Sequence, residues 1–253
     1  MADNDTSSTD TVAGTDYRFT HLSIPLVMRD MRFASGDPGP GDPFPEFDLP
    51  TLDGGRIRTA DLAASGPMLI VFGSATCPIT DSAVPGLKAL HARYGEQVRF
   101  VVVNVREAHP GAEIPQPTTI DEKRAHAERL RSLYGFTFDV AVDDIDGALH
   151  RSVGPKPNSA YLVDKSGVIL FRAHWANSTA AINDALDAVV AGRPLTRGKS
   201  GGMPLAVARS MRNIPTVLDR AGKGAWADMW RVTPPMTATA FLLRLAGLGR
   251  SGA

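Results

Sequence analysis

Residues 68–78 read Met-Leu-Ile-Val-Phe-Gly-Ser-Ala-Thr-Cys-Pro, a stretch with the pattern of a strand, a turn and the start of a helix. Its first five residues form an apolar run of the length expected for a buried strand. A short polar turn follows at 73–76, and after Pro78 the apolar residues recur at helical spacing. Cys77 is therefore predicted at a helix N-terminus, where unpaired N–H groups and the helix dipole favour a thiolate. It is a candidate nucleophile, and a structural buried cysteine is the alternative.

Strands and helices alternate around this stretch. The apolar pattern predicts helices after Pro78 through Tyr94 and at 120–134, 146–153 and 180–191, and strands at 98–105, 140–142, 160–163 and 168–172. A hairpin is predicted at 47–58, and the helix at 120–134 opens with a capping box and stops at Gly135. Parallel strands followed by a terminal hairpin and a closing helix predict an α/β, thioredoxin-like fold with a central mixed sheet flanked by helices.

Four parts follow along the chain. Residues 1–16 are predicted to be disordered, 17–43 to hold a short helix (21–33) and a Pro/Gly linker, and 44–193 to form the thioredoxin-like domain. Residues 194–253 are predicted to form a tail of short helices at 203–211, 217–220 and 241–248, broken by prolines. We expect the tail to dock on the core, although a partner or a membrane surface could also receive it.

The composition of the chain argues against several classes of function. The 253 residues carry no net charge, which argues against a nucleic-acid partner. One cysteine excludes an internal disulfide and a Cys-rich metal site, so a redox cycle needs an external thiol or a thioredoxin-like reductant, and no bound cofactor or metal is expected. No apolar run reaches the length of a transmembrane segment, and the N-terminus lacks a signal-peptide pattern, so we expect a cytoplasmic protein. A homodimer stays possible.

Polar residues follow two neighbouring strands. Cys77 comes after the first, and Arg106-Glu-Ala-His109 after the next, and carboxyl ends of parallel strands meet at one edge of a sheet. His109 could hold or deliver a proton, and Glu107 could orient it. Ser74 and Thr76 could donate hydrogen bonds to the sulfur or to a developing anion. The alternatives are a surface glutamate, a loop histidine and hydroxyls that satisfy the turn.

Other residues have weaker signals. Pro157 precedes the last hairpin, where thioredoxin-like folds often hold a cis proline facing the active-site cysteine, and Trp175 follows the last strand, so both are candidates for substrate binding. Trp226 and Trp230 share one helical face and could cover the mouth of the site. The remaining histidines are predicted to lie on helices or loops without a partner: His21, His91, His126 and His150.

Residues 69–78 resemble the active-site segment of iodothyronine deiodinases, where a selenocysteine occupies the position of Cys77. Residues 104–110, Asn-Val-Arg-Glu-Ala-His-Pro, resemble that family's Glu-Ala-His segment, Ile114-Pro-Gln116 resembles a short stretch after it, and 160–171 resembles its closing hairpin. The resemblance covers about residues 44–192. It implies that Cys77 is the nucleophile, His109 and Glu107 the proton-handling pair, and Ser74 and Thr76 the supporting hydroxyls.

The chain also departs from that family. Pro117 stands where a histidine often follows Ile-Pro-Gln, the Asp-Gly-Trp after Glu-Ala-His is missing, there is no N-terminal membrane helix, and sulfur replaces selenium. Thyroid hormone is therefore not the expected substrate.

Three functions remain open. The first is a thiol-dependent oxidoreductase that reduces a halogenated aromatic or another small electrophile, with an external thiol as reductant. The second is a one-cysteine peroxidase, because Ser74-x-x-Cys77 fits half of the peroxiredoxin Pro-x-x-x-Thr/Ser-x-x-Cys pattern, with Ile70 in place of the proline. The third is a non-catalytic thioredoxin-fold binding protein. Thr80 stands where a dithiol enzyme needs its second cysteine, so disulfide exchange is the least expected chemistry.

Overall fold

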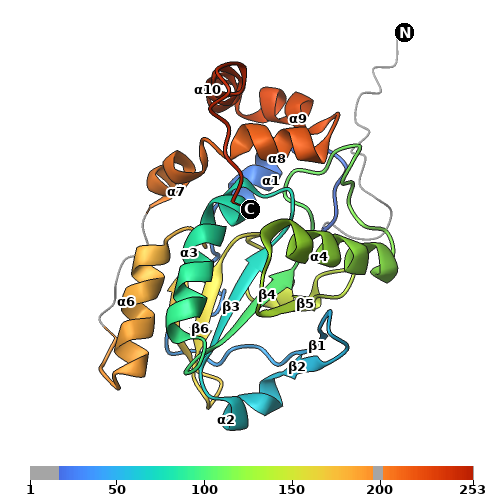
Figure 1. Cartoon of the computed structure of the whole chain (residues 1–253). Coiled ribbons are helices and arrows are strands. Elements are labelled where there is room, and N and C mark those ends of the chain that lie inside the picture. The colour runs from blue at the N-terminus through green and yellow to red at the C-terminus, as the bar shows by residue number, and fades with distance from the viewer. Residues whose placement is uncertain (1–16, 196–201, 253) are drawn as a thin grey trace.

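A five-stranded mixed sheet forms the centre of the protein, whose computed structural model describes residues 17–195 and 202–252 (Figure 1). The strand order is β5-β4-β3-β6-β7. The parallel strands are β3 (Met68–Gly73), β4 (Arg99–Asn104) and β5 (Asp139–Val142), and the antiparallel pair is β6 (Ala160–Val163) and β7 (Ile169–Ala173). This arrangement confirms the predicted thioredoxin-like α/β fold.

The alternation of side chains along β3 divides the core into two layers. Leu69 and Val71 pack with one face of helices α3 (Pro78–Tyr94), α4 (Ile120–Tyr134) and α6 (Thr179–Val190). Met68, Ile70 and Phe72 belong to the opposite layer. That layer is covered by α5 (Ala148–Ser152), α2 (Leu62–Ser65) with the short η1 (Thr59–Asp61), and the hairpin of β1 (Asp48–Pro50) and β2 (Arg56–Arg58). Each fully buried aliphatic side chain contributes about 1.5–3 kcal/mol.

Helix α4 begins and ends at the predicted residues because its ends are capped. The Thr119 hydroxyl accepts a hydrogen bond from the Glu122 amide at 3.2 Å, and Gly135 ends the helix with a left-handed φ of 59°. The Glu122 carboxylate accepts from Thr118, one residue before the position that a capping box would use.

The N-terminal helix is shorter than predicted. Helix α1 spans Ile24–Asp30 rather than 21–33, because the Ser23 hydroxyl caps it and Pro25 lies in its first turn.

Four helices follow residue 202, one more than predicted: α7 (Met203–Ser210), α8 (Ile214–Ala221), α9 (Ala225–Val232) and α10 (Pro234–Leu245). The expectation that prolines break this tail was wrong. Pro204, Pro215, Pro234 and Pro235 stand in the first turns of helices, where the missing N–H has no helical partner to lose. Helix α9 was anticipated only through Trp226 and Trp230, which were expected to share one helical face.

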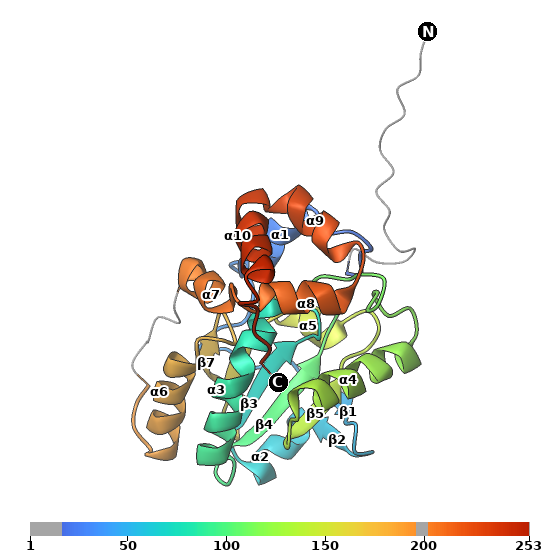
Figure 2. The same cartoon turned by 45° about the horizontal axis from the view of Figure 1, so that its top comes forward.

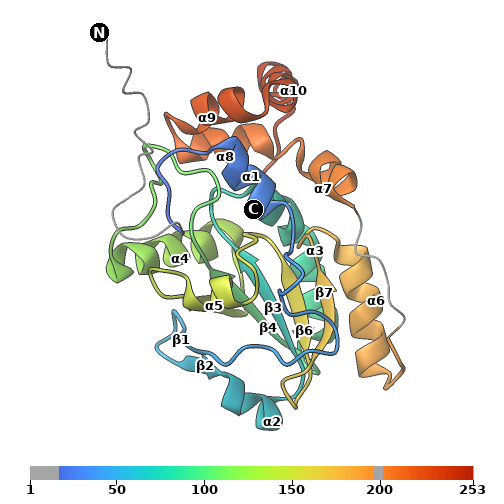
Figure 3. The same cartoon turned by 180° about the vertical axis from the view of Figure 1, so that it is seen from behind.

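The tail docks on the core and encloses one end of the sheet. Together with the N-terminal segment it forms a cap, residues 17–31 and 203–252, above α3 and the carboxyl ends of β3 and β4 (Figures 1, 2 and 3). Phe19 and Leu22 of the first segment pack against Ile214, Leu218 and Met229 of the second.

Asp81 anchors this cap to α3. Its fully buried carboxylate accepts hydrogen bonds from Asn213 at 2.7 Å, from the Gly252 amide at 2.7 Å and from Arg220 at 3.0 Å. Arg220 also donates to the carbonyl of Ala75, in the turn before Cys77, at 3.1 Å. The position of the cap is therefore coupled to the turn that carries the cysteine. Within residues 17–195 and 202–252, no helix is both long and apolar enough to cross a bilayer.

Candidate active site

Cys77 is the N-cap residue of α3, as predicted, with Pro78 in the first turn. Its amide donates to the carbonyl of Ser74 at 3.3 Å, which closes the turn between β3 and α3. A negative charge on the sulfur is stabilised at this end of a helix. The side chain is buried, with 2% of its surface exposed.

The sulfur faces the turn before β6. The Asn158 side-chain amide donates to Sγ at 3.6 Å, and Trp175 packs in one apolar cluster with Cys77 and Ile79. Pro157 also lies against this space. Its peptide bond is trans, as are all others among the described residues, so Pro157 is not the cis proline that thioredoxin-like folds often hold at this place.

Lys156 is the charged group next to this cluster, and the sequence did not single it out. Its ammonium lies 3.0 Å from the centre of the Trp175 ring and donates to the carbonyl of Asp30 at 3.3 Å. Burial lowers the pKa of Lys156 to about 7, although the charges of Cys77 and Asp30 act in the opposite direction. A buried lysine with this pKa can both accept and donate a proton near neutral pH.

Asp30 brings a carboxyl group from α1 to the same site. Burial raises the pKa of Asp30, while the nearby Arg106 and Arg29 oppose the rise. Arg106 is fully buried and donates to the Asp30 carboxylate at 2.6 Å. The N-terminal segment therefore supplies a charged residue to the site as well as apolar cover.

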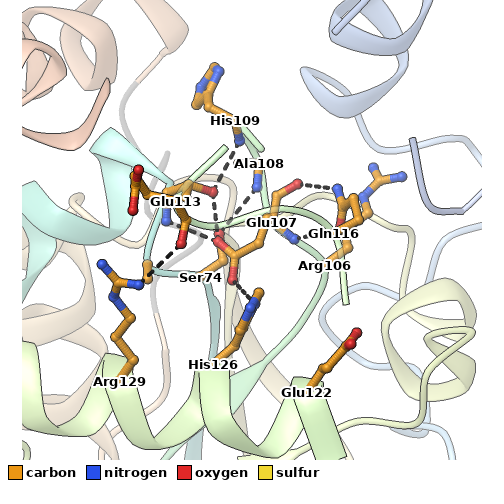
Figure 4. Close-up of polar contacts among 12 residues, drawn as sticks. Ser74, Arg106, Glu107, Ala108, His109, Glu113, Gln116, Glu122, His126 and Arg129 are labelled. Atoms are coloured by element: carbon orange, nitrogen blue, oxygen red, sulfur yellow. Dashed lines mark hydrogen bonds and ion pairs between the residues drawn. The ribbon is translucent and has the colours of Figure 1, made fainter. Parts of the chain in front are cut away.

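Glu107 does not form the expected pair with His109. Its buried carboxylate accepts from the Thr76 hydroxyl at 2.6 Å and amide at 3.1 Å, and contacts His126 Nδ1 at 3.1 Å (Figure 4). The Glu107 amide and carbonyl are both bonded to the side chain of Gln116. Glu107 thus fixes the turn before Cys77 to the loop after β4 and to α4.

The side chain of His109 lies at the cavity beside Cys77 and not beside the Glu107 carboxylate. Its imidazole points away from the Glu107 carboxylate (Figure 4) and lines the cavity beside Cys77. Burial lowers the pKa of His109 to about 4, so the ring is neutral near pH 7. Its Nδ1 is buried and has no hydrogen-bond partner among the residues described. His109 is therefore poorly suited to be the main proton carrier.

The two hydroxyls hold loops together. Thr76 Oγ1 accepts from the His109 amide at 3.1 Å in addition to its bond with Glu107, and Ser74 Oγ accepts from the Ala108 amide at 3.3 Å. Both are fully buried, and no hydrogen bond links either hydroxyl to the sulfur in the described structure. The expectation that they support the sulfur directly is replaced by a role in joining the two loops.

Three histidines that were predicted to lack partners have them. His126 contacts Glu107, His150 Nδ1 lies 2.8 Å from the Tyr17 hydroxyl, and His21 lies 3.3 Å from Asp228. All three partners are distant in sequence, so local patterns could not reveal them.

A cavity of about 90 Å³ lies between Cys77 and the cap. Its core side includes Cys77, His109, Asn158 and Trp175. The cap contributes apolar side chains, among them Leu22, Val27, Met31, Ile214, Met229 and Met236. Trp226 and Trp230 were expected to cover this space, but neither lines it; Met229, from the same helix, does. The space suits a small, largely apolar molecule with a polar reactive end.

The AhpC/TSA family model matches residues 40–172. The chain belongs to the AhpC/TSA family. This assignment supports the redoxin type of thioredoxin-like protein and gives no support to the iodothyronine deiodinase family that the sequence resemblance implied. The cap of this AhpC/TSA protein lies outside the matched residues.

Individual relatives are more distant. The thiol-disulfide oxidoreductase ResA of Geobacillus thermodenitrificans is 28% identical over 131 residues, which cover 51% of this AhpC/TSA chain and 66% of ResA. An uncharacterised conserved protein of Geobacillus kaustophilus has a TM-score of 0.48 at 20% identity, covering 63% of this chain and 86% of its own. Peroxidoxin BcpB of Mycobacterium tuberculosis has a TM-score of 0.44 at 15% identity. The match covers 62% of this chain and 99% of the BcpB chain.

Proposed function

We propose that the protein is a thiol-based oxidoreductase of the redoxin type that acts as a one-cysteine peroxidase on a small organic hydroperoxide. The observation that carries this proposal is the largely apolar cavity beside Cys77, together with Lys156, whose ammonium packs on the ring of Trp175, one of the residues that line that cavity. Family membership supports the choice of redoxin chemistry. The buried sulfur, 2% exposed, argues against a protein disulfide as substrate, because a second protein could not reach it without moving the cap.

Lys156 would move the proton in this reaction. Neutral Lys156 takes the proton of the Cys77 thiol, and the ammonium that forms stabilises the thiolate. The thiolate attacks the hydroxyl oxygen of the hydroperoxide, so that an S–O bond forms and the O–O bond breaks. Cys77 becomes a sulfenic acid, and the departing alkoxide takes a proton from the Lys156 ammonium and leaves as an alcohol.

A second thiol must complete the cycle. The chain has one cysteine, so an internal disulfide cannot form. An external low-molecular-weight thiol would condense with the sulfenic acid, releasing water and leaving a mixed disulfide, and a second molecule of thiol would restore Cys77. No bound cofactor takes part.

Reductive dehalogenation is the second candidate, favoured by the largely apolar side chains that line the cavity beside Cys77 and would suit an aromatic ring. There the thiolate would take iodine from an aryl carbon to give a sulfenyl iodide. The carbon would accept a proton from Lys156, and an external thiol would then release iodide and form a disulfide with Cys77. Thyroid hormone is not proposed as the substrate.

One experiment separates these reactions from a binding protein. The reduced protein and Cys77→Ser are mixed separately with cumene hydroperoxide and with an iodophenol, and sulfenate, cumyl alcohol and iodide are measured. Sulfenate at Cys77 with release of the alcohol supports the peroxidase. Iodide release without reaction with hydroperoxide would replace it with the dehalogenase, and no turnover of either would leave a non-catalytic binding protein.

A further inference from the structure

Exposed apolar side chains gather on the cap. Eleven large apolar side chains are exposed in the part of the chain that the structure describes, and nine of them belong to the cap: Ile24, Met28, Met203, Leu205, Trp230, Phe241, Leu242, Leu245 and Leu248. The other two, Ile120 and Val190, lie on α4 and α6. The cap helices lie at one end of the molecule in all three views (Figures 1, 2 and 3).

The most exposed of these side chains come from α10 and the residues beside it. Leu242 and Leu245 expose 65% and 67% of their surface. The ring of Phe241 lies 6.3 Å from that of Trp230, which connects α10 to α9. Trp230, Phe241, Leu242, Leu245 and Leu248 are called the apolar patch below. Apolar side chains grouped on a soluble domain in this way mark a contact surface.

The charge around the apolar patch is positive. Residues 202–252 contain seven basic and two acidic residues, whereas the whole chain has no net charge. Arg231, Arg244 and Arg250 adjoin the patch in sequence and are exposed. The two acidic residues pair with two of these arginines, Asp228 with Arg231 at 3.0 Å and Asp219 with Arg244 at 2.8 Å, which leaves Arg250 and the other basic residues of this segment in excess. The surface therefore combines apolar side chains with an excess of arginine.

We propose that the apolar patch docks on an anionic lipid surface. Leucine, phenylalanine and tryptophan on one face with arginine at its border is the composition of a helix that lies in a membrane interface. A second copy of the chain fits less well, because a symmetric contact would bring two positively charged surfaces together. Docking places the cap, and so the cavity beneath it, next to the bilayer.

The helices of the cap have two different faces. Their inner faces supply Ile214, Met229 and Met236 to the cavity, and their outer faces carry the apolar patch. Lipid docking rests on the outer face alone. It does not depend on the proposed peroxidase reaction, and it can be measured without any turnover.

Vesicle co-sedimentation of the full chain tests the proposal. We expect binding to vesicles of phosphatidylcholine mixed with phosphatidylglycerol, little binding to phosphatidylcholine alone, and weaker binding at high salt. Leu242→Glu combined with Leu245→Glu should lower the partition coefficient at least about tenfold. Arg244→Gln combined with Arg250→Gln should weaken binding to the anionic vesicles and leave the weak binding to neutral vesicles unchanged.

The matched control is Ile120→Glu combined with Val190→Glu, which changes two exposed apolar residues outside the cap. It should bind vesicles as the unchanged protein does, and circular dichroism checks that every variant is folded. Absence of binding to anionic vesicles, or an equal loss in the control, would overturn the proposal. A dimer seen by analytical ultracentrifugation that Leu242→Glu and Leu245→Glu dissociate, without vesicle binding, would assign the patch to a second copy instead.

Discussion

Lys156 combines two properties that a proton carrier needs in a closed site. It is buried against Trp175, and the pKa of its ammonium is lowered to about 7 by burial. His109, the residue that the sequence favoured, has a pKa of about 4 because burial of its ring outweighs the charge of Asp228, which acts in the opposite direction. At neutral pH both the protonated and the neutral form of Lys156 are well populated. The ring of His109 is almost entirely neutral, so it has no proton of that kind to donate.

Lys156→Met should slow sulfenate formation at Cys77 by about a hundredfold near neutral pH, since the variant neither accepts nor donates a proton. In the unchanged protein the rate should fall as the pH drops through about 7, because the protonated lysine cannot accept the thiol proton. Stopped-flow measurement of the reaction with cumene hydroperoxide checks both expectations.

Lys156→Arg is the control for charge alone. It keeps a permanent cation beside Cys77 but releases no proton near neutral pH. We expect thiolate absorbance to persist in this variant while the rate stays low. Full activity of the arginine variant, or an unchanged pH profile in Lys156→Met, would show that Lys156 is not the proton carrier.

Glu107 acts by positioning. Glu107→Gln keeps one acceptor but weakens the contacts to Thr76 and His126, and a buried polar group left without a partner costs about 1–3 kcal/mol. Urea unfolding should show that loss, and kcat should fall more than KM changes. His126→Gln should reproduce part of both effects, and the double variant should lose less than the sum of the two. Fully additive losses would mean that the two residues act independently.

Sequence patterns correctly predicted one part of the site, the contact between the turn before Cys77 and the loop after β4. The rule that parallel strands end at the same edge correctly predicted that Cys77 and the 106–109 loop adjoin, as the bonds from Thr76 to Glu107 and His109 show. It could not find Lys156 or Asp30. Lys156 comes from a turn without periodicity, and Asp30 comes from a segment whose place depends on the packing of the cap. Pro157, which follows Lys156 directly, was the only residue of this turn that the sequence patterns singled out.

At the scale of elements, the cap is held to α3 by buried charges. Arg220 and Asp81 form an ion pair whose side chains are 11% and 0% exposed, and Arg220 reaches the turn before Cys77. Removing one partner of such a pair leaves a buried charge without its counterion. The residue that fixes α8 therefore also contacts the turn that carries the sulfur.

Arg220→Met should lower the free energy of unfolding by about 3 kcal/mol. It should also increase the rate at which Cys77 reacts with a bulky thiol reagent such as dithionitrobenzoate, because the cap opens more often. Arg244→Met, which removes an exposed ion pair with Asp219, should cost at most about 1 kcal/mol and leave the thiol rate unchanged. Equal reagent rates in the two variants would contradict the role of Arg220 in closing the site.

The elements of the core could be predicted because their patterns are local. Helix α4 has a cap, a periodic apolar face and a terminal glycine, and its limits were correct. The tail was harder to predict, because a proline either breaks a helix or begins one, and tertiary contacts decide which. The start of helix α9 at Ala225 was not predicted, because the preceding residue, Gly224, offers no side-chain cap.

At the scale of the whole molecule, buried titratable groups make stability depend on pH. Burial lowers the pKa of His109 from 6.5 to about 4 and lowers that of His150 well below 6.5. Below pH 6.5 these two histidines bind protons in the unfolded chain before they do so in the folded one. The stability of the fold therefore falls as the pH drops below about 6.5. The raised pKa values of Asp30 and Asp143 act in the opposite direction at lower pH.

Urea unfolding at about pH 7.5 and about pH 5 checks this expectation. The unchanged protein should be less stable at the lower pH. Between these two pH values, the free energy of unfolding of His109→Leu should fall by up to about 2 kcal/mol less than that of the unchanged protein. The reason is that the variant has no histidine to protonate at this position. An identical loss in the variant would mean that His109 titrates normally in the folded protein.

Reduction of a hydroperoxide by Cys77 inside the cavity beneath the cap is the proposed reaction. Its most direct test adds one equivalent of cumene hydroperoxide to the reduced protein in the presence of dimedone and measures intact mass and cumyl alcohol. We expect one dimedone adduct at Cys77 for each alcohol released, and neither product with Cys77→Ser. Unmodified Cys77 with no alcohol released would contradict it.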